Sequence, residues 1–508
     1  MEIFVSGAIN LITFVAMLGI LVFVHELGHF AVAKRLGIAV PEFGFGFPPR
    51  VWKFWQSDGW IEIQGRRIVI PRTLPVPANL AYNSQVRYKT TTQNNREVLT
   101  AIEVIDPADE NVALASPVQN LDRGTEYTLN AVPLGGFVRL LGEDDPNVPN
   151  GFANAKPSVR APILLAGVTM NFILALIVLT LGALFVPPYA NVTTTTISNI
   201  AANSPAALAG LRPADTITAI NRQDIKHNYP LFRQTIRASA GQPVTLTVQR
   251  GAQTFDVPVT PRANPPKNEG PLGIQLNGWV GLQITDVARG SLADQAGTRP
   301  GDVLLFFVDK DRSLRDQSEL EQFTQTHLGW KVDWRIARGN TLLDPITVQI
   351  PTTLAPQDAA LGLNLRLSPL AAPGKALSDM WTMLTTIPLL FAQLFEGSAP
   401  ANAFVGPIGI ARVTGEVAQR GGWLALLQLT GLLSLNLAVV NLLPFPGLDG
   451  GRLVFAALEW LRRGKRIDPQ KEGVVHLIGL VILVGLMVII SYFDVLSAVS
   501  GQPIIPTP

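Results

Sequence analysis

A charged pentapeptide, His25-Glu26-Leu27-Gly28-His29, interrupts an otherwise apolar run that covers residues 3–33. The run is long enough for a helix that crosses a bilayer, and ionisable groups at that depth are costly enough to indicate a functional site. Because positions i and i+4 share one face of a helix, both imidazoles can bind a single metal ion. Glu26 can then act as a general base on water at that ion. The motif predicts a zinc-dependent hydrolytic site inside a membrane.

Chance is a poor explanation of this motif. The chain has five histidines in 508 residues, so a coincidental match is expected in on the order of one such sequence in 500. In a structural alternative, both histidines would bond to backbone carbonyls in a helix bundle. That alternative explains neither Glu26 nor the spacing, so the pattern favours metal binding.

The composition is that of a membrane protein: 47% of the residues are hydrophobic, 15% are charged and the mean hydropathy is +0.27. A net charge of +2 gives no indication of nucleic-acid binding. The absence of cysteine excludes disulfides and thiolate ligands, so any metal must be held by histidine and carboxylate. The N-terminus lacks the basic segment of a cleavable signal peptide, and we expect its apolar run to be a retained helix.

Four segments are predicted to cross the bilayer, at about 4–33, 160–186, 423–443 and 473–493. Basic residues near helix ends indicate the cytoplasmic side. The pair 34–35 follows the first span, Lys156 and Arg160 precede the second, and a basic cluster fills 452–471; Arg420 is the exception. We expect a multi-pass protein of the cell membrane with both termini extracytoplasmic.

Two segments on the predicted cytoplasmic side have the composition of strands. The glycine- and aromatic-rich residues 43–49 suit a hairpin at the membrane interface, although a plain turn has the same signature. Residues 133–140, with Gly135 and Gly136, read as a strand pair just before the second span. Between them, residues 75–125 form a polar insertion to which we assign no chemistry.

The region between the second and third spans contains a repeat. Residues 204–215 recur as residues 291–302, an offset of 87 residues, and apolar strand-like segments follow both copies. Each copy resembles a PDZ domain of the bacterial, circularly permuted kind. Such domains add an extended peptide to a sheet edge, but rigid spacers or gates that bind no peptide remain an equal alternative.

These segments give the predicted fold class: a polytopic α-helical membrane protein with four transmembrane helices, a membrane-associated β-hairpin or sheet and two extracytoplasmic PDZ domains (α+β). The predicted divisions are 1–36 (first membrane helix with the motif), 37–158 (cytoplasmic-side β-rich region), 159–188 (second membrane helix), 190–263 and 270–355 (PDZ domains), 370–422 (extracytoplasmic amphipathic helix region), 423–451 (third membrane helix and Leu-Asp-Gly-Gly motif), 452–471 (cytoplasmic basic segment) and 472–498 (fourth membrane helix).

Two histidines do not complete a catalytic zinc site, which needs a third protein ligand and one position for water. Asp449 is the best candidate, in the segment 441–451 at the cytoplasmic end of the third span. Its depth matches that of His25 and His29. The segment 441–451 is expected to have an irregular backbone. Such a backbone is tolerated at that depth only where it is buried in protein or lines a wet cavity, and both settings suit a metal ligand. The alternative is an aspartate that caps the next helix.

At this point the chain resembles the site-2 protease family of intramembrane zinc metalloproteases, in particular the bacterial two-PDZ type that cleaves anti-sigma factors within the membrane. The resemblance covers nearly the whole chain and is carried by residues 25–29, 133–138, 406–410 and 441–451. The polar stretch 75–125 is longer than the family pattern.

The resemblance implies roles for individual residues. His25, His29 and Asp449 would bind Zn²⁺ and Glu26 would be the catalytic base. Residues that would hold the substrate or its oxyanion are Asn436 and Asn441, and the strand with Gly135 and Gly136 would pair with the substrate. Asn436 and Asn441 have an equal alternative role in interhelical hydrogen bonds.

The implied activity is hydrolysis of peptide bonds in or near the transmembrane segment of a single-span membrane protein, such as an anti-sigma factor or a signal-peptide remnant. Two other classes stay open. One is a membrane-bound PDZ scaffold or quality-control protein with a non-catalytic metal site, against which the intact Glu26 argues. The other is a metal transporter, which would need more polar residues along its spans than the second and fourth spans carry.

Overall fold

The computed structural model describes residues 2–105, 115–143, 145, 147–225, 228–266, 269–307, 312–313, 317–339, 341–355, 358–395, 405–465 and 467–499. Parts of the predicted divisions therefore lie outside the described residues, including 106–114 of the polar insertion and 396–404 before the third span. The chain forms two compact units, residues 1–179 with 376–508, and residues 180–375.

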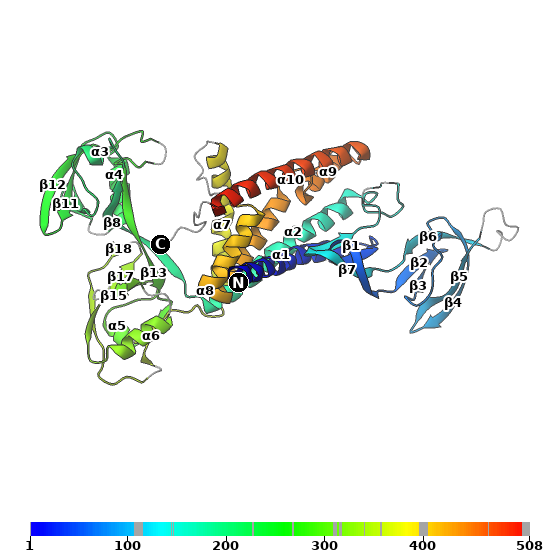
Figure 1. The fold of residues 1–508 in the computed structure, drawn as a ribbon, viewed down its shortest axis with the longest axis horizontal. Helices are drawn as coiled ribbons and strands as arrows, with labels where there is room; N and C mark the ends of the chain where they lie inside the picture. Colours follow the sequence, from blue (N-terminus) through cyan, green and yellow to red (C-terminus); the bar gives the residue numbers. More distant parts are fainter. Residues whose placement is uncertain are drawn as a thin grey trace. The chain divides into compact units, whose positions relative to one another are not determined.

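Four helices among the described residues are long and apolar enough to cross a membrane, over Asn10–Arg35, Pro157–Phe185, Gly422–Leu442 and Gln470–Ser497. They belong to α1 (Glu2–Arg35), α2 (Pro157–Phe185), α8 (Pro407–Leu442) and α10 (Pro469–Val499) (Figure 1). The backbone of Gly422 is non-helical, with φ of 60°, and it divides α8 into a leading segment and the third span. Each of the four predicted spans coincides with one of these helices, as expected for a multi-pass membrane protein.

Two further helices belong to the same unit. They are α7 (Ala372–Phe395) and α9 (Asp449–Leu461). Ala376 and Met380 of α7 are buried against Ala175, Leu179 and Leu435 of the spans. Where an amphipathic helix region is predicted, at 370–422, the described residues contain α7 and the leading segment of α8.

A small sheet, which we call the membrane sheet, is built from β1 (Glu42–Gln56) and β7 (Glu126–Arg139). Each strand folds back on itself, so residues 42–47 pair on one side with 136–139 and on the other with 126–132, which in turn pair with 50–56. The order across the sheet is therefore 136–139, 42–47, 126–132, 50–56. Residues 136–139 form one open edge of this sheet.

The predicted polar insertion, residues 75–125, supplies three strands of a closed five-stranded barrel that begins before it, at residue 59. Its strands are β2 (Gly59–Ile63), β3 (Arg66–Ile70), β4 (Gln85–Gln93), β5 (Arg96–Val104) and β6 (Ser116–Asp122), in the order β2-β3-β5-β4-β6. Alternation of apolar and polar residues, as in Trp60-Ile61-Glu62-Ile63, sends every second side chain inward. The apolar side chains that fill the interior include Ile61, Ile63, Ile68, Ile70, Val86, Leu99 and Val118. Closure leaves the barrel without an open edge.

The second unit contains two halves that share the order strand, short helix, two strands, helix, two strands, and the second half has β14, β18 and β20 in addition. The first half has β8 (Tyr189–Ile200), α3 (Pro205–Leu208), β9 (Thr216–Ile220), β10 (Gln223–Asp224), α4 (Tyr229–Ala238), β11 (Val244–Arg250) and β12 (Gln253–Val259). The second has β13 (Ile274–Gln283), β14 (Asp286–Val287), α5 (Leu292–Gln295), β15 (Val303–Phe307), β16 (Arg312–Ser313), α6 (Gln317–Thr326), β17 (Lys331–Arg338), β18 (Thr341–Leu342), β19 (Ile346–Gln349) and β20 (Leu363–Asn364). Antiparallel pairing of β8 with β13 joins the two halves.

Each half also contains the same buried ion pair. The side chain of Asp215 accepts two hydrogen bonds from Arg250, whose guanidinium also donates to the carbonyl of Gly210. In the second half, Asp302 and Arg338 repeat this arrangement with the carbonyl of Gly297. The sequence repeat is thus a repeat of structure down to its polar contacts.

The buried pair leads to a stability prediction. Asp215 is fully buried, so Asp215→Asn replaces a carboxylate that accepts two hydrogen bonds from Arg250 by a neutral amide and should lower the free energy of unfolding of its domain. Thermal melting followed by limited proteolysis of residues 190–263 measures this. Asp256→Asn, at an exposed position, is the matched control, and equal losses in both variants would contradict the prediction.

The same carboxylate predicts a pH dependence. Burial alone would raise the pKa of Asp215, but hydrogen bonds from the Arg250 side chain and the Arg212 backbone outweigh burial and hold that pKa below its ordinary value. A carboxyl whose folded pKa is depressed stabilises the fold above its unfolded pKa, near 3.9. The contribution is lost as the pH falls through the folded pKa, and Asp215→Asn should remove this acid sensitivity.

Candidate metal centre and active site

Three metal-ligating side chains from distant parts of the chain converge at one point. His25 and His29 lie one turn apart on α1, and Asp449 is the first residue of α9. Asp449 Oδ2 is 3.0 Å from His25 Nε2 and 3.3 Å from His29 Nε2, and the two Nε2 atoms are 3.1 Å apart. Both histidines are buried. The residue that caps α9 is Leu448, without a side-chain hydrogen bond, so the geometry does not support the capping alternative for Asp449.

These contacts fit a divalent cation. Ligand atoms about 2.0 Å from a tetrahedral zinc lie about 3.3 Å from one another, close to the three distances observed. His29 Nδ1 donates to the carbonyl of Ile163 at 2.8 Å, which leaves Nε2 as a lone pair facing the Asp449 carboxylate. Two lone pairs at that distance repel unless a cation lies between them, so the donor set suits zinc.

A second polar residue supports His25. The side-chain amide of Asn171, on α2, is 3.2 Å from His25 Nδ1, and Ser434 of α8 donates to the Asn171 carbonyl at 2.8 Å. The atom of this amide that faces Nδ1 is the nitrogen Nδ2, and the amide oxygen of Asn171 is buried without a hydrogen-bond partner. With Nε2 of His25 bound to metal, Nδ1 would carry a proton, and the Asn171 amide turned by 180° would place its oxygen to accept it. In the sequence, Asn171 is a polar residue in the apolar second predicted span. An amide at the depth of the histidines was the signal for this role.

Two glycines let α1 and α2 approach closely at the metal centre. A Cβ on Gly167 would lie 2.4 Å from His29 Nε2 and 2.7 Å from His25 Cε1, and a Cβ on Gly28 would lie 2.4 Å from the carbonyl oxygen of Ala166. Neither glycine has a positive φ. Both glycines are required because a larger side chain would not fit between the two helices, and the sequence alone does not reveal this requirement.

Gly167→Ala should therefore weaken metal binding by about tenfold, because its methyl group would displace both imidazoles. Competition with a fluorescent zinc chelator on the purified protein measures the affinity. Gly485→Ala on α10 is the matched control, since a Cβ there meets no atom within 4 Å. Equal zinc affinities for the two variants would refute the steric argument.

The metal centre opens into a cavity of about 400 Å³. Glu26 lines this cavity with the three ligands, and so does Gly136, where a Cβ would lie 3.2 Å from Cβ and Cγ of Glu26. Gly135 has φ of +119°, and a Cβ there would lie 2.4 Å from Cβ of Val22. The open edge of the membrane sheet therefore begins against α1, directly beside the glutamate.

The fourth span supports the loop that carries Asp449. The N–H of Gly447 donates to Nδ1 of His476 on α10 at 2.9 Å. Gly479, one turn further along α10, faces the carbonyl oxygen of Pro446, and a Cβ on Gly479 would lie 2.1 Å from that oxygen. These contacts hold residues 446–447 against α10 and fix the start of α9.

Other residues occupy positions that the sequence did not predict. Phe47 and the ion pair Glu143–Arg452, 2.5 Å between charged atoms, line the cavity. Asn436 and Asn441 lie on α8 and are partly buried, and neither is among the described residues that line the cavity. Their predicted contact with substrate remains a proposal.

Comparison with known proteins agrees with this geometry. The model of Peptidase family M50 matches residues 13–62 and 114–486, and residues 63–113, most of the barrel, fall between the two matched segments. The zinc metalloprotease RasP of Geobacillus kaustophilus is 26% identical over 96% of this chain and 97% of its own. A putative zinc metalloprotease of Neisseria meningitidis is 29% identical over 76% of this chain and 91% of its own.

The regulator of sigma-E protease RseP of Salmonella typhimurium is 26% identical over 90% of this chain and 91% of its own. The family match spans both halves of the metal centre and the edge strand between them. The resemblance seen in the sequence is confirmed: the chain belongs to Peptidase family M50 and is a metalloprotease of the site-2 type.

Proposed function

We propose that His25, His29 and Asp449 hold a zinc ion and that Glu26 is the general base in the hydrolysis of a membrane-spanning substrate. The observation that carries this proposal is the convergence of three ligand atoms beside Glu26 at an open sheet edge. Zinc, when bound, supplies a Lewis acid that activates both the scissile carbonyl and water. Glu26 takes the proton of the attacking water and passes it to the leaving amine.

The open edge at residues 136–139 can offset the cost of unwinding a substrate helix within the membrane. The carbonyls of a membrane helix are tied up in internal hydrogen bonds, and unwinding the helix in lipid leaves backbone groups unpaired at several kcal/mol each. An edge strand can pair with those groups and present an extended peptide to the metal centre. Gly135 and Gly136 allow this strand to start against α1, and Asn436 and Asn441 can donate neutral hydrogen bonds to substrate or oxyanion.

We further propose the location and the surroundings of the enzyme. The basic residues near the spans favour a cell-membrane protein with extracytoplasmic termini and with the metal centre near the cytoplasmic face. The two halves of residues 190–355 are proposed to be extracytoplasmic PDZ domains, a proposal that the 87-residue repeat supports. The far edge of the membrane sheet exposes Trp52 and Trp55, residues that favour the membrane interface.

The substrate is proposed to be a single-span membrane protein, such as an anti-sigma factor or a signal-peptide remnant. Two relatives carry names that indicate such a pathway: the regulator of sigma-E protease of Salmonella typhimurium and the regulator of sigma-W protease RasP of Bacillus subtilis. The proposed reaction needs only the protein, zinc and a lipid or detergent phase.

Removal of the metal tests the proposal. The purified protein should cleave a model single-span substrate, lose that activity after treatment with the chelator phenanthroline, and regain it when zinc is restored. Mass spectrometry of the products locates the cleaved bond. Cleavage that persists after complete removal of zinc, or a cleaved bond far outside the membrane segment, would contradict the proposal.

A further inference from the structure

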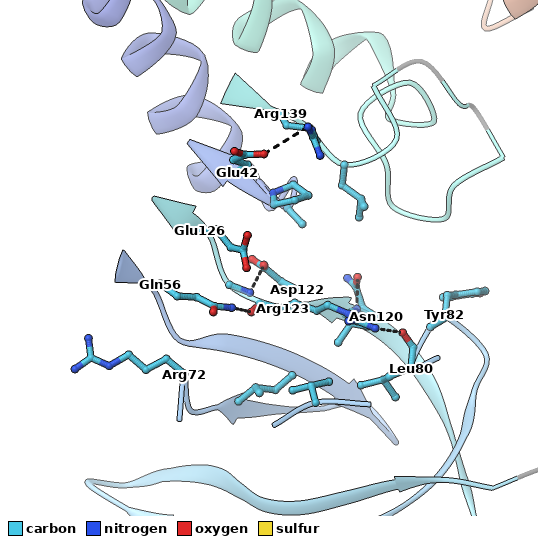
Figure 2. A pocket seen from close by; sticks show the side chains of 18 of the residues that line it. Glu42, Gln56, Arg72, Leu80, Tyr82, Asn120, Asp122, Arg123, Glu126 and Arg139 are labelled. Atoms are coloured by element: carbon cyan, nitrogen blue, oxygen red, sulfur yellow. Dashed lines mark hydrogen bonds and ion pairs between the residues drawn. The ribbon is translucent and has the colours of Figure 1, made fainter. Parts of the chain in front are cut away.

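A second cleft, of about 990 Å³, lies between the membrane sheet and the barrel (Figure 2). Its walls are residues 39–42 at the start of β1, the barrel loop 71–82, residues 120–126 and, after β7, Leu141 with residues 147–149. Most of the barrel lies in the segment that the family model does not match. The wall of the cleft formed by residues 70–82 therefore lies outside the matched segments, and its other walls lie within them.

The negatively charged side chains of the cleft are more buried than the positively charged ones. The carboxylates are the more buried groups, with 10% of the Glu42 side chain, 6% of Asp122 and 31% of Glu126 exposed. Each is within 3.4 Å of a cationic group, and the pairs are Glu42–Arg139, Asp122–Lys34 and Glu126–Arg50. By contrast, 57% of the Arg139 side chain and 51% of the Arg50 side chain are exposed.

Arg72 adds an exposed guanidinium on the barrel side of the same cleft. A molecule that enters the cleft therefore meets arginines first and finds the carboxylates already neutralised. Guanidinium groups form paired hydrogen bonds with carboxylates. The cleft is suited to a negatively charged ligand.

The open edge of the membrane sheet ends at Arg139, and this residue also lines the cleft. Residues 136–138 and Leu140 line the metal cavity, whereas Arg139 and Leu141 line the cleft. A peptide paired with residues 136–139 that continues past Arg139 runs into the cleft.

We propose that this cleft binds an extended acidic segment of the substrate, the water-side flank of its membrane segment, and so selects which substrates reach the metal centre. The inference rests on the proposed hydrolysis of a membrane-spanning substrate. Arg139 and Arg72 are specificity-determining residues for that flank, and neither takes part in bond cleavage.

The spread of polar groups favours a peptide over a lipid headgroup. Figure 2 shows Arg139, Arg72 and Tyr82 at separate sides of the cleft, so their polar ends do not converge on one compact phosphate. Apolar side chains line the same cleft, including Ile70, Leu74, Val76 and Leu121. Separated charges over an apolar floor suit an extended chain with spaced carboxylates.

Binding of a soluble peptide tests the proposal without any cleavage. The full chain with Glu26→Gln is placed in discs of zwitterionic phosphatidylcholine, and fluorescence anisotropy is recorded with a labelled peptide in which Asp alternates with Gly. We expect saturable binding that is about tenfold weaker after Arg72→Glu. A peptide with Lys in place of Asp should not bind.

Arg96→Glu is the matched control, because Arg96 is an exposed arginine of the same barrel outside the lining of the cleft. If the Arg96→Glu protein binds the acidic peptide as tightly as the protein without a cleft substitution, the result supports the proposal. Equal losses of peptide affinity in Arg72→Glu and Arg96→Glu would indicate unspecific charge attraction and overturn it. Absence of acidic-peptide binding, together with an Arg72-dependent preference for discs of anionic phosphatidylglycerol, would assign the cleft to a lipid headgroup and also overturn it.

Kinetics separate this proposal from the proposed function. In the active enzyme, Arg72→Glu should raise KM for a substrate with an acidic flank about tenfold at unchanged kcat, with no effect on a neutral-flank substrate. If no substrate of either kind is cleaved but the acidic peptide still binds in an Arg72-dependent way, the proposed hydrolysis fails and the binding site stands. If both substrates are cleaved with the same KM in both proteins, the hydrolysis stands and the specificity site fails.

Discussion

Replacement of Glu26 by Gln should lower kcat for cleavage of a single-span substrate by about a thousandfold while the zinc content stays the same. The substitution keeps the size of the side chain and removes its basicity. Glu26 lines the same cavity as the three ligands, but the cluster that can hold a metal consists of His25, His29 and Asp449. Loss of proton transfer without loss of metal is therefore the expected signature.

Two measurements on the same samples make this test decisive. Elemental analysis gives the zinc content, and gel-based quantification of the products gives kcat. Glu97→Gln, on the surface of the barrel, serves as the matched control and should retain full activity. Full cleavage by Glu26→Gln would remove this residue from the reaction, and loss of zinc would show that it belongs to the ligand set.

The second large effect is expected at Asp449. Asp449→Ala removes one of three protein ligands and should weaken zinc binding by at least about 100-fold, with loss of cleavage as the consequence. The remaining Nε2 atoms of His25 and His29 would still face each other at 3.1 Å, which favours weak two-ligand binding. Titration with a zinc-buffered chelator measures the change.

A second buried aspartate provides the control for Asp449. Asp494, on α10, accepts a hydrogen bond from the backbone N–H of Gly409 near the start of α8 at 2.8 Å. Asp494→Asn removes a buried charge of the same type at a helix start, so it should affect stability and leave zinc affinity unchanged. Comparable zinc affinities in Asp449→Ala and Asp494→Asn would eliminate Asp449 as a ligand.

The sequence brought out the three candidate metal ligands because its signals are local and costly. Charged groups cost free energy inside a membrane. The chain has such groups in the His-Glu-x-x-His motif of an apolar helix and in an acid of a broken helix at matching depth, and a shared metal ion accounts for both. The four spans follow equally from the length of apolar runs. The structure brings Gly136 beside Glu26 as expected, whereas Asn436 and Asn441 lie on α8 without lining the cavity.

The parts that the sequence did not predict depend on contacts between distant segments. Gly167 matters because α2 passes within contact of two imidazoles on α1, and no property of Gly167 itself signals that. His476 matters because a loop about thirty residues away in sequence rests on it. Likewise, the short strands in residues 59–122 carry alternating patterns, but closure into a barrel depends on non-local pairing that local propensity does not specify.

The way the barrel joins the membrane sheet has a further consequence. The chain enters the barrel after Gln56 and leaves it before Glu126, and these two residues are paired neighbours in the sheet. Trp60 and Asp122, the next pair outward, are also partners. Because the chain enters and leaves the barrel at neighbouring residues, a change in the length of the barrel segment need not disturb the pairing of the membrane-sheet strands beside Glu26.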